Sequence, residues 1–314
     1  MSTARHAAGQ LPADSADATV VRLAVLTDIH LSPVGTPDGS WNNRTLRSVS
    51  SQLLRAAVDD IAAGGHRHAL VLGDISDDGS QEMIGTALLA IAEAGLETWA
   101  VPGNHDVSRD PHALDIAAER VSSAVALRSQ PVRVRESITL AGTRLRSSDN
   151  GETCEAVNLP DVTAITSRTL LWAGHYPLIS QKAALLAAGL RHPGDLRNLQ
   201  QARAAAERHA GPIVVLHGHL HTAITSLDGK MLQLGFPAMV EWPHAWTDLR
   251  IETSPGGAIV RAAIRPVAGN WSQPTRNTLL ASTEQTWQLA GGRWLAASVR
   301  ADPEASTPAG TETT

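Results

Sequence analysis

The chain has 314 residues, and its 43% hydrophobic content is enough for the core of one large domain or of one domain with an appendage. A formal net charge of −5 gives no basic surface of the kind that binding to the nucleic acid backbone requires, so bulk DNA or RNA is a poor candidate substrate. The single cysteine, Cys154, excludes an internal disulfide and a zinc site built from several thiolates.

The sequence predicts neither a membrane-spanning segment nor a secretory signal. No apolar run reaches the ~18 residues that a membrane span needs. The first twenty residues lack the apolar block of a secretory signal. We therefore expect a cytoplasmic protein that does not associate with membranes.

Short apolar runs alternate with longer amphipathic stretches, which is the pattern of strands joined by helices and indicates an α/β fold. In the first half, the pattern predicts strands at 21–26, 69–72 and 97–101, and helices at 44–63 and 81–94. In the second half, it predicts strands at 169–173 and 212–216 on either side of a helix at 195–210. Four short β-like segments follow, at 223–227, 231–234, 248–252 and 258–264, and we interpret them as the second sheet of a two-sheet core.

These elements suggest one main domain, from 21 to 265, followed by a β extension from 266 to 300. Residues 1–20 and 301–314 are rich in small and polar types without periodicity, and we expect them to be disordered tails. Within the extension, two apolar segments flank Gly291 and Gly292, which predicts a hairpin. We expect the hairpin to cover an edge of the core, with a homodimer as the alternative.

Polar residues that are good metal ligands or acid–base groups follow the predicted strands. They are Asp28, His30, Asp74, Asn104, His105, His175, His219 and His221. Because loops at the carboxyl ends of neighbouring strands converge on one edge of an open α/β sheet, we expect these side chains to share one site. Imidazole nitrogen with carboxylate and amide oxygen suits divalent manganese, iron or zinc.

The spacing of these residues agrees with a metal site. Asp28 and His30 are separated by one residue, and so are His219 and His221. In an extended segment, each pair would therefore place both side chains on the same side. A carboxylate can give one oxygen to each of two ions, and we expect Asp74 to be such a bridge.

The runs TDIH, GDISDDG, GNHD, GHY and GHLH, in this order, resemble the five sequence blocks of the calcineurin-like metallophosphoesterase superfamily. The blocks extend from Asp28 to His221, and the resemblance covers the chain from Val21 to about Ile264. It implies a two-sheet β-sandwich flanked by helices. It also implies that one ion is held by Asp28, His30 and His221, and the other by Asn104, His175 and His219, with Asp74 between them.

The resemblance further implies a hydrolase in which a hydroxide that bridges the two ions attacks a phosphate ester in line with the leaving group. Two divalent ions outweigh the charge of two carboxylates, so the site would attract an anionic phosphate although the protein is acidic. His105 would contact the phosphate or protonate the leaving oxygen. Asp106 could orient His105.

Three further polar residues near these blocks have a simple structural interpretation. His217, in HGHLH, would support a ligand or stand at the end of its strand, and we favour such a supporting or structural role. Asp77 and Asp78 closely follow the bridging aspartate, but acidic residues here are also an ordinary signal for the start of a helix.

The segment EWPHAW, residues 241–246, brings three rings soon after the last metal block. In the superfamily, this part of the chain often borders the substrate cleft, so Trp242, His244 or Trp246 could contact the leaving group. The alternative is that the rings pack where the second sheet closes, and we favour packing.

Three classes of function are compatible with the sequence. We favour a small-molecule phosphodiesterase, because the layout of TDIH, GNHD and GHLH is similar to that of the bacterial branch with cyclic nucleotide and glycerophosphodiester phosphodiesterases. The alternative is a phosphatase for a small metabolite or nucleotide. A nuclease shares the five blocks, but the acidic chain argues against it. A non-catalytic scaffold of this fold would have lost ligands, and none is lost here.

Overall fold

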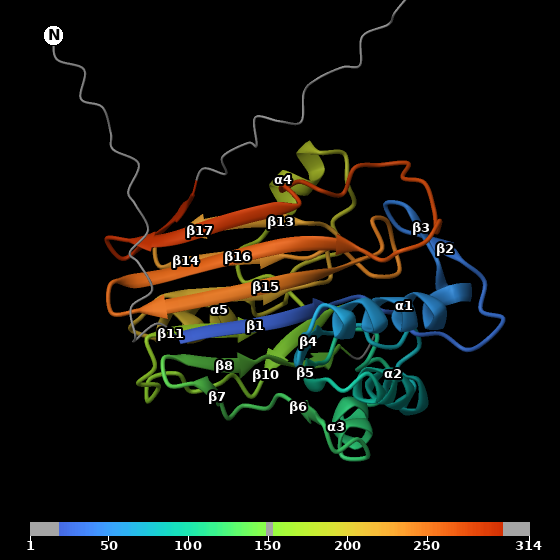
Figure 1. Ribbon diagram of the computed structural model, residues 1–314, viewed down its shortest axis with the longest axis horizontal. Coiled ribbons are helices and arrows are strands. Elements are labelled where there is room, and N and C mark those ends of the chain that lie inside the picture. The colour runs from blue at the N-terminus through green and yellow to red at the C-terminus, as the bar shows by residue number, and fades with distance from the viewer. Residues whose placement is uncertain (1–18, 149–152, 298–314) are drawn as a thin grey trace, which may run out of the picture.

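Two packed β-sheets form the centre of the molecule, and helices cover their outer faces (Figure 1). The computed structural model describes residues 19–148 and 153–297. The predicted tails at 1–20 and 301–314 lie outside the described residues, except that residues 19 and 20 begin the first strand. The α/β two-sheet sandwich expected from the sequence is confirmed.

The larger sheet combines strands from both ends of the chain. Its order is β18-β17-β16-β15-β1-β4-β5-β6. These strands are β1 (Thr19–Leu26), β4 (His68–Leu72), β5 (Glu97–Val101), β6 (Ala124–Ala126), β15 (Ala245–Ser254), β16 (Gly257–Pro266), β17 (Glu284–Ala290) and β18 (Arg293–Ala296). Strands β1, β4, β5 and β6 run parallel, whereas β15 to β18 pair antiparallel.

The smaller sheet has the order β13-β14-β12-β11-β8-β7, with a parallel centre and antiparallel edge strands. Its strands are β7 (Val132–Arg135), β8 (Ile138–Gly142), β11 (Thr169–Ala173), β12 (Ile213–His217), β13 (Ile224–Asp228) and β14 (Met231–Gly235). Two short ribbons are formed by β2 (Gly39–Ser40) with β3 (Arg44–Thr45), and by β9 (Arg144–Ser147) with β10 (Cys154–Val157).

The helices are α1 (Ser50–Ala63), α2 (Gln81–Glu93), α3 (Ala113–Ala118), α4 (Lys182–Ala187) and α5 (Leu199–Glu207), with a 3₁₀ turn η1 at Arg47–Val49. Helices α1, α2 and α3 lie together over the parallel half of the larger sheet (Figure 1). Helix α5 packs on the outer face of the smaller sheet. Within the described part of the chain, no helix is long and apolar enough to cross a membrane.

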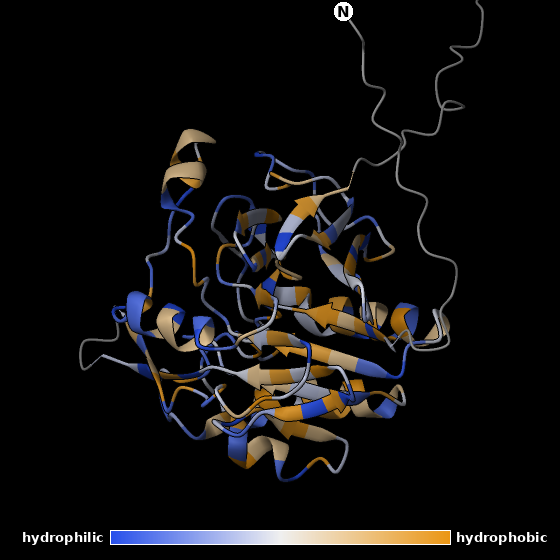
Figure 2. Ribbon diagram, turned by 90° about the vertical axis from the view of Figure 1, so that its left-hand side faces the viewer, coloured by the Kyte–Doolittle hydropathy of each residue, from blue (hydrophilic) through white to orange (hydrophobic). Residues whose placement is uncertain are grey.

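The central strands are buried on both faces, which explains why they read as unbroken apolar runs. In β1, Leu23 and Val25 point between the two sheets, while Ala24 and Leu26 face the helices. All four side chains are at most 1% exposed. The strands are accordingly rich in hydrophobic residues, whereas many of the loops are hydrophilic (Figure 2).

Both long helices predicted from the sequence are shorter in the structure. The helix expected at 44–63 begins at Ser50, because Arg44 and Thr45 pair with β2 and the amide of Leu46 donates to the carbonyl of Val240. The helix expected at 195–210 is α5 alone. The side chain of Asn198 bonds both the amide and the carbonyl of Ala156, so the residues before α5 are held by tertiary contacts instead.

The interpretation of the late β segments needs correction. Strands β13 and β14 do belong to the second sheet, but β15 and β16 extend the first sheet, with β15 pairing antiparallel to β1 along most of its length. Which sheet β15 and β16 join depends on pairing between strands over 200 residues apart in the sequence. The periodicity of a single segment contains no information about such pairing. The hairpin predicted around Gly291 and Gly292 is present as β17 and β18, at the edge of the larger sheet.

Candidate active site

The polar residues singled out in the sequence lie together at one edge of the two sheets, where the parallel strands end. Strands β1 and β4 lead to Asp28, His30 and Asp74, β5 leads to Asn104 and His105, and β11 and β12 lead to His175, His219 and His221. Six of these side chains are buried, and those of Asn104 and His105 are partly exposed. The chain therefore brings eight residues from five strand ends to one site.

Five of these residues have a left-handed backbone, with φ of 50° at Asp28, 45° at His30, 48° at Asp74, 66° at His219 and 53° at His221. The pairs 28/30 and 219/221 are thus not in extended segments, and the expectation that two-residue periodicity aligns them was wrong. Such backbone costs ~1–3 kcal/mol per residue and persists only where the surroundings enforce it. Asp and His tolerate it better than most residues.

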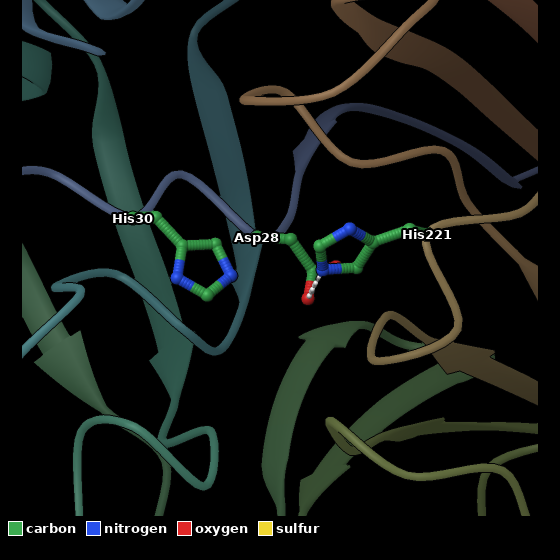
Figure 3. Close-up of side chains that lie close together, drawn as sticks. All are labelled: Asp28, His30 and His221. Carbon is green, nitrogen blue, oxygen red and sulfur yellow. Dashed lines mark ion pairs between the residues drawn. The ribbon is translucent and has the colours of Figure 1, made fainter. Parts of the chain in front are cut away.

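One cluster consists of Asp28, His30 and His221, whose ligand atoms lie within 4.8 Å of one another (Figure 3). The Nε2 atom of His221 is 3.3 Å from Oδ1 of Asp28. The Nδ1 atom of His30 bonds Asp77 at 3.1 Å, which leaves its Nε2 for a ligand. This buried Nε2 has no hydrogen-bond partner among the described residues. A buried imidazole nitrogen without a partner fits a metal ion.

Asp74 lies between this cluster and a second one. Its Oδ2 is 3.7 Å from Nε2 of His30 and 3.3 Å from Nε2 of His175. The same nitrogen of His175 is 3.1 Å from Oδ1 of Asn104 and 4.0 Å from Oδ1 of Asp28. The Nδ1 atom of His175 donates to a backbone carbonyl, so its Nε2 is the nitrogen that faces the site.

His219 lies at the border of this second cluster. Its ring centroid is 5.1 Å from that of His175 and 3.9 Å from that of Tyr176. Its Nε2 lies 3.2 Å from the carbonyl oxygen of Gly194. Because that nitrogen is engaged, Nδ1 is the atom of His219 that remains for a metal ion.

The electrostatics of the site also fit metal ions. Burial favours the neutral form of each group and prevails at His30 and His219, whose pKa values are lowered. At four other groups, the attraction between carboxylates and imidazoles outweighs burial. The pKa of Asp28 is lowered to about 2, and that of Asp74 lies well below its ordinary value. The pKa of His175 is raised to about 9 and that of His221 to about 10. The buried carboxylates are thus held as anions, which is the form that binds divalent cations.

His105 is one of the two partly exposed residues of the centre, with 39% of its side chain exposed. Its backbone amide donates to Asp74, and its Nδ1 donates to the carbonyl oxygen of Asp77 at 2.6 Å. Burial alone would lower the pKa of the ring, but the neighbouring Asp74 carboxylate and the Asp77 carbonyl raise it. The ring thus has Nε2 available to a substrate in the cleft that it lines.

Asp106 is fully buried and braces the backbone of the site. Its carboxylate accepts hydrogen bonds from the amides of Ile75, Ser76 and Gly103 and so joins the loops that follow β4 and β5. Burial and the nearby Asp74 raise its pKa to about 6. The ring of His105 is held by Asp77, not by the Asp106 carboxylate, so we assign Asp106 a structural contribution to the site.

The sequence analysis missed Glu241, which is fully buried beside the first cluster. One of its oxygens is 2.6 Å from Nδ1 of His221, and the other accepts from the amide of Asn43. A carboxylate that holds the second nitrogen of a histidine ligand fixes the ring and its tautomer. The sequence signal for Glu241 is an acidic residue in the otherwise apolar run that precedes the rings of residues 242–246.

For the remaining candidates, supporting or packing roles are favoured by the sequence. His217 is buried, with Nδ1 2.9 Å from the carbonyl oxygen of Gly218. His244 lies 2.6 Å from the hydroxyl of Ser272, and the indole of Trp246 donates to Asp60. Trp242, His244 and Trp246 are not among the described residues that line the cleft, in agreement with the packing interpretation.

A cleft of about 300 Å³ opens above the candidate metal-ligand residues. Its floor contains several of them together with His105 and Asp77. Its outer walls are formed by Gly39, Ser40, Trp41, Thr45, Arg47, Thr153, Cys154, Tyr176, Pro193 and Val240.

Comparisons with known proteins agree with this geometry. A family model described as calcineurin-like phosphoesterase matches residues 21–223. A dimetal phosphatase from Danio rerio has a similar structure, with a TM-score of 0.55 and 12% identity over 80% of this chain and 99% of that one. The protein TT1561 of Thermus thermophilus has a TM-score of 0.46 and 15% identity over 74% of this chain and 94% of that one.

The phosphoesterase Yfce from E. coli has a TM-score of 0.36 and 12% identity over 79% of this chain and all of that one. No curated protein is detectably similar in sequence. The family model spans more than half of the chain and includes all five strand ends that supply the site. The chain therefore belongs to the calcineurin-like phosphoesterase family and is a metal-dependent phosphoric ester hydrolase.

Proposed function

We propose that the protein uses two divalent metal ions to hydrolyse a small-molecule phosphate diester. We infer the preference for a diester from the charges of the residues that line the cleft. Among the described residues that line it, Arg47 is the one lysine or arginine, and its guanidinium is paired with Asp77 at 3.0 Å. A phosphate monoester carries up to two negative charges near pH 7, whereas a diester carries one. A cleft whose one arginine is neutralised, with His105 as the further group that can carry a positive charge, suits the diester.

The ligand set divides between two ions. Asp28, His30 and His221 would hold one, and Asn104, His175 and His219 the other, with Asp74 shared. When bound, the ions supply an activated water nucleophile and neutralise charge on the phosphate. Manganese, iron and zinc all suit this mixture of nitrogen and oxygen donors.

The protein's own groups then orient the ester. The hydrogen bond from Nδ1 of His105 to the Asp77 carbonyl fixes the ring. Its protonated form, favoured by the raised pKa, can donate from Nε2 to a phosphate oxygen or to the departing oxygen. Asp77 also bonds Nδ1 of His30, so a single residue positions a metal ligand and the proposed proton donor.

The first test compares metal-free protein with protein reconstituted with manganese, iron or zinc. The substrates are bis(p-nitrophenyl) phosphate and p-nitrophenyl phosphate, with Asp74→Asn as the inactive control. We expect metal-dependent turnover, faster for the diester. The reverse preference would make the protein a phosphatase for a small metabolite or nucleotide. Absence of turnover with every metal would contradict a catalytic function.

A further inference from the structure

One wall of the cleft is a short hairpin, residues 39–47, which contains β2 and β3 and which we call the Trp41 hairpin. Trp41 and Arg47 of this hairpin line the cleft. Trp41 is only partly buried, and it belongs to none of the hydrophobic clusters formed by the described residues. A large ring at a cleft wall that contributes to no core needs another explanation than packing.

The Trp41 hairpin is anchored to the metal centre through Glu241. The amide of Asn43 donates to one oxygen of this buried carboxylate, and His221 bonds the other. The side-chain oxygen of Asn43 also accepts from the amides of Thr275 and Arg276, at 2.8 Å and 2.9 Å. The hairpin is therefore held at a fixed position relative to a metal ligand.

A second anchor reaches Trp41 from the loop at 189–194. The guanidinium of Arg191 lies over the indole ring, 5.2 Å from its centroid, in a cation–π arrangement. The amide of Arg191 donates to the side-chain oxygen of Asn42, next to Trp41. The same loop contacts the metal ligand His219 through the carbonyl of Gly194. Both sides of the Trp41 hairpin are thus connected to histidines of the metal centre.

The hairpin also contains hydrogen-bond donors without a partner among the described residues. Three of its donors are shielded from solvent and have no acceptor among the described residues, namely Nε1 of Trp41, Nδ2 of Asn42 and Nε of Arg47. Donors left unpaired in this way are costly unless solvent or a ligand satisfies them after a small adjustment. A ligand with a flat face would match this wall, and its acceptor atoms would reach these donors only after such an adjustment.

We propose that Trp41 is a recognition platform for a flat heterocyclic group on the substrate, with Arg191 supporting the ring and Arg47 beside it. This inference rests on the proposed function and specifies which phosphate esters the cleft selects. Stacking on a rigid ring contributes affinity at little entropic cost, because the platform is already ordered before binding. The anchors through Glu241 and through the loop at 189–194 fix the distance from the hairpin to the metal centre. A heterocycle stacked on Trp41 would therefore lie at one defined distance from the phosphate.

Binding to the manganese-loaded protein tests the platform without requiring turnover. The ligands are adenosine 5′-monophosphate and ribose 5-phosphate, which differ only in the base, and calorimetry gives both dissociation constants. We expect the nucleotide to bind about tenfold more tightly, as base–aromatic stacking predicts. Trp41→Leu should abolish this difference and Trp41→Phe should retain most of it. The matched control is Trp271→Leu, which removes another partly buried tryptophan outside the cleft lining and should leave the difference intact.

Kinetics with two diesters that share one leaving group separate this proposal from the proposed function. We compare methyl p-nitrophenyl phosphate with thymidine 5′-(p-nitrophenyl) phosphate and follow the ratio of their kcat/KM values. The ratio should favour the nucleoside ester and fall about tenfold in Trp41→Leu. Equal ratios in wild type and variant, together with equal binding of the nucleotide and the sugar phosphate, would overturn the platform. If the wild type hydrolysed neither ester but still bound the nucleotide more tightly than the sugar phosphate, only the proposed diesterase function would be contradicted.

Discussion

Glu241→Gln is the substitution that tests most directly whether the cluster at the strand ends is a metal centre. The carboxylate is fully buried and accepts two hydrogen bonds, one from the Asn43 amide and one from Nδ1 of His221. A glutamine has one acceptor oxygen. If this oxygen stays with Asn43, the new NH₂ group faces Nδ1 of His221. The ring must then give up its proton there and carry it on Nε2, the nitrogen that points to Asp28.

The size of the effect follows from this change of tautomer. A hydrogen bond to a charged group contributes ~1.5–3 kcal/mol, and ~1.4 kcal/mol corresponds to a factor of ten in affinity. We therefore expect manganese to bind roughly 10- to 150-fold more weakly, which overlaps the range of about 10- to 100-fold known for residues that hold a metal ligand. Activity measured at limiting metal should fall in parallel and recover partly at high metal concentration.

Manganese titration monitored by calorimetry gives the affinity, and denaturant unfolding of the metal-free proteins shows whether the variant remains folded. Glu252→Gln is the matched control: it makes the same chemical change on β15, where Glu252 pairs with Arg250 and Arg261 at the surface. It should bind manganese like the wild type. If Glu241→Gln bound manganese within about threefold of the wild type, the assignment of His221 as a ligand held by Glu241 would be refuted.

Four further predictions concern the centre itself. Asp74→Asn should lose both stoichiometric manganese and turnover, and metal analysis that found two ions per chain would contradict its shared role. His105→Ala should lower kcat by roughly 10²- to 10⁴-fold with metal content unchanged, so a fully active variant would exclude it as a proton donor. Metal affinity should rise with pH from 6 to 9, because the raised pKa values of His175 (about 9) and His221 (about 10) mean that both rings must lose a proton when metal binds. Calorimetry in buffers of different ionisation enthalpy should detect this proton release. If no protons were released, the raised pKa values would be contradicted. Asp106→Asn should lower the unfolding free energy of the metal-free protein by about 1–3 kcal/mol, since an NH₂ group would face a backbone amide, and unchanged denaturant curves would show that the carboxylate is no brace.

Local pattern was sufficient to predict the five parallel strands that lead to the site, whereas the parallel strands β6 and β8 were not predicted. Strands such as β11 are buried on both faces and end abruptly at a polar residue, so their limits are visible in the sequence. The predicted helix at 44–63 failed at its start because long-range pairing overrides propensity there. Leu46 bonds Val240, almost two hundred residues away, and this contact holds the preceding residues in a hairpin. Such pairing leaves no trace in local periodicity.

The same distinction separates the parts of the site that the sequence reveals from those it hides. Residues such as Asp28 and His221 are recognisable because each stands in a short run at a strand end. Glu241 and Trp41 carry no such signature, since each acquires its place through contacts with distant segments. The left-handed backbone of the ligands was equally invisible, and it contradicted the extended geometry that residue spacing alone suggested.

Glu241 supports both the proposed metal centre and one wall of the cleft, so substitutions near it affect both. Glu241 holds His221 with one oxygen and the Trp41 hairpin with the other. A change in the hairpin that moved Asn43 would therefore also disturb the orientation of His221, a proposed metal ligand. The ring of Trp41 takes no part in these hydrogen bonds, because its contact is the cation–π arrangement with Arg191. Side chains exchanged at position 41 should thus alter which ester is selected at a smaller cost to metal binding than changes anywhere in the anchoring residues.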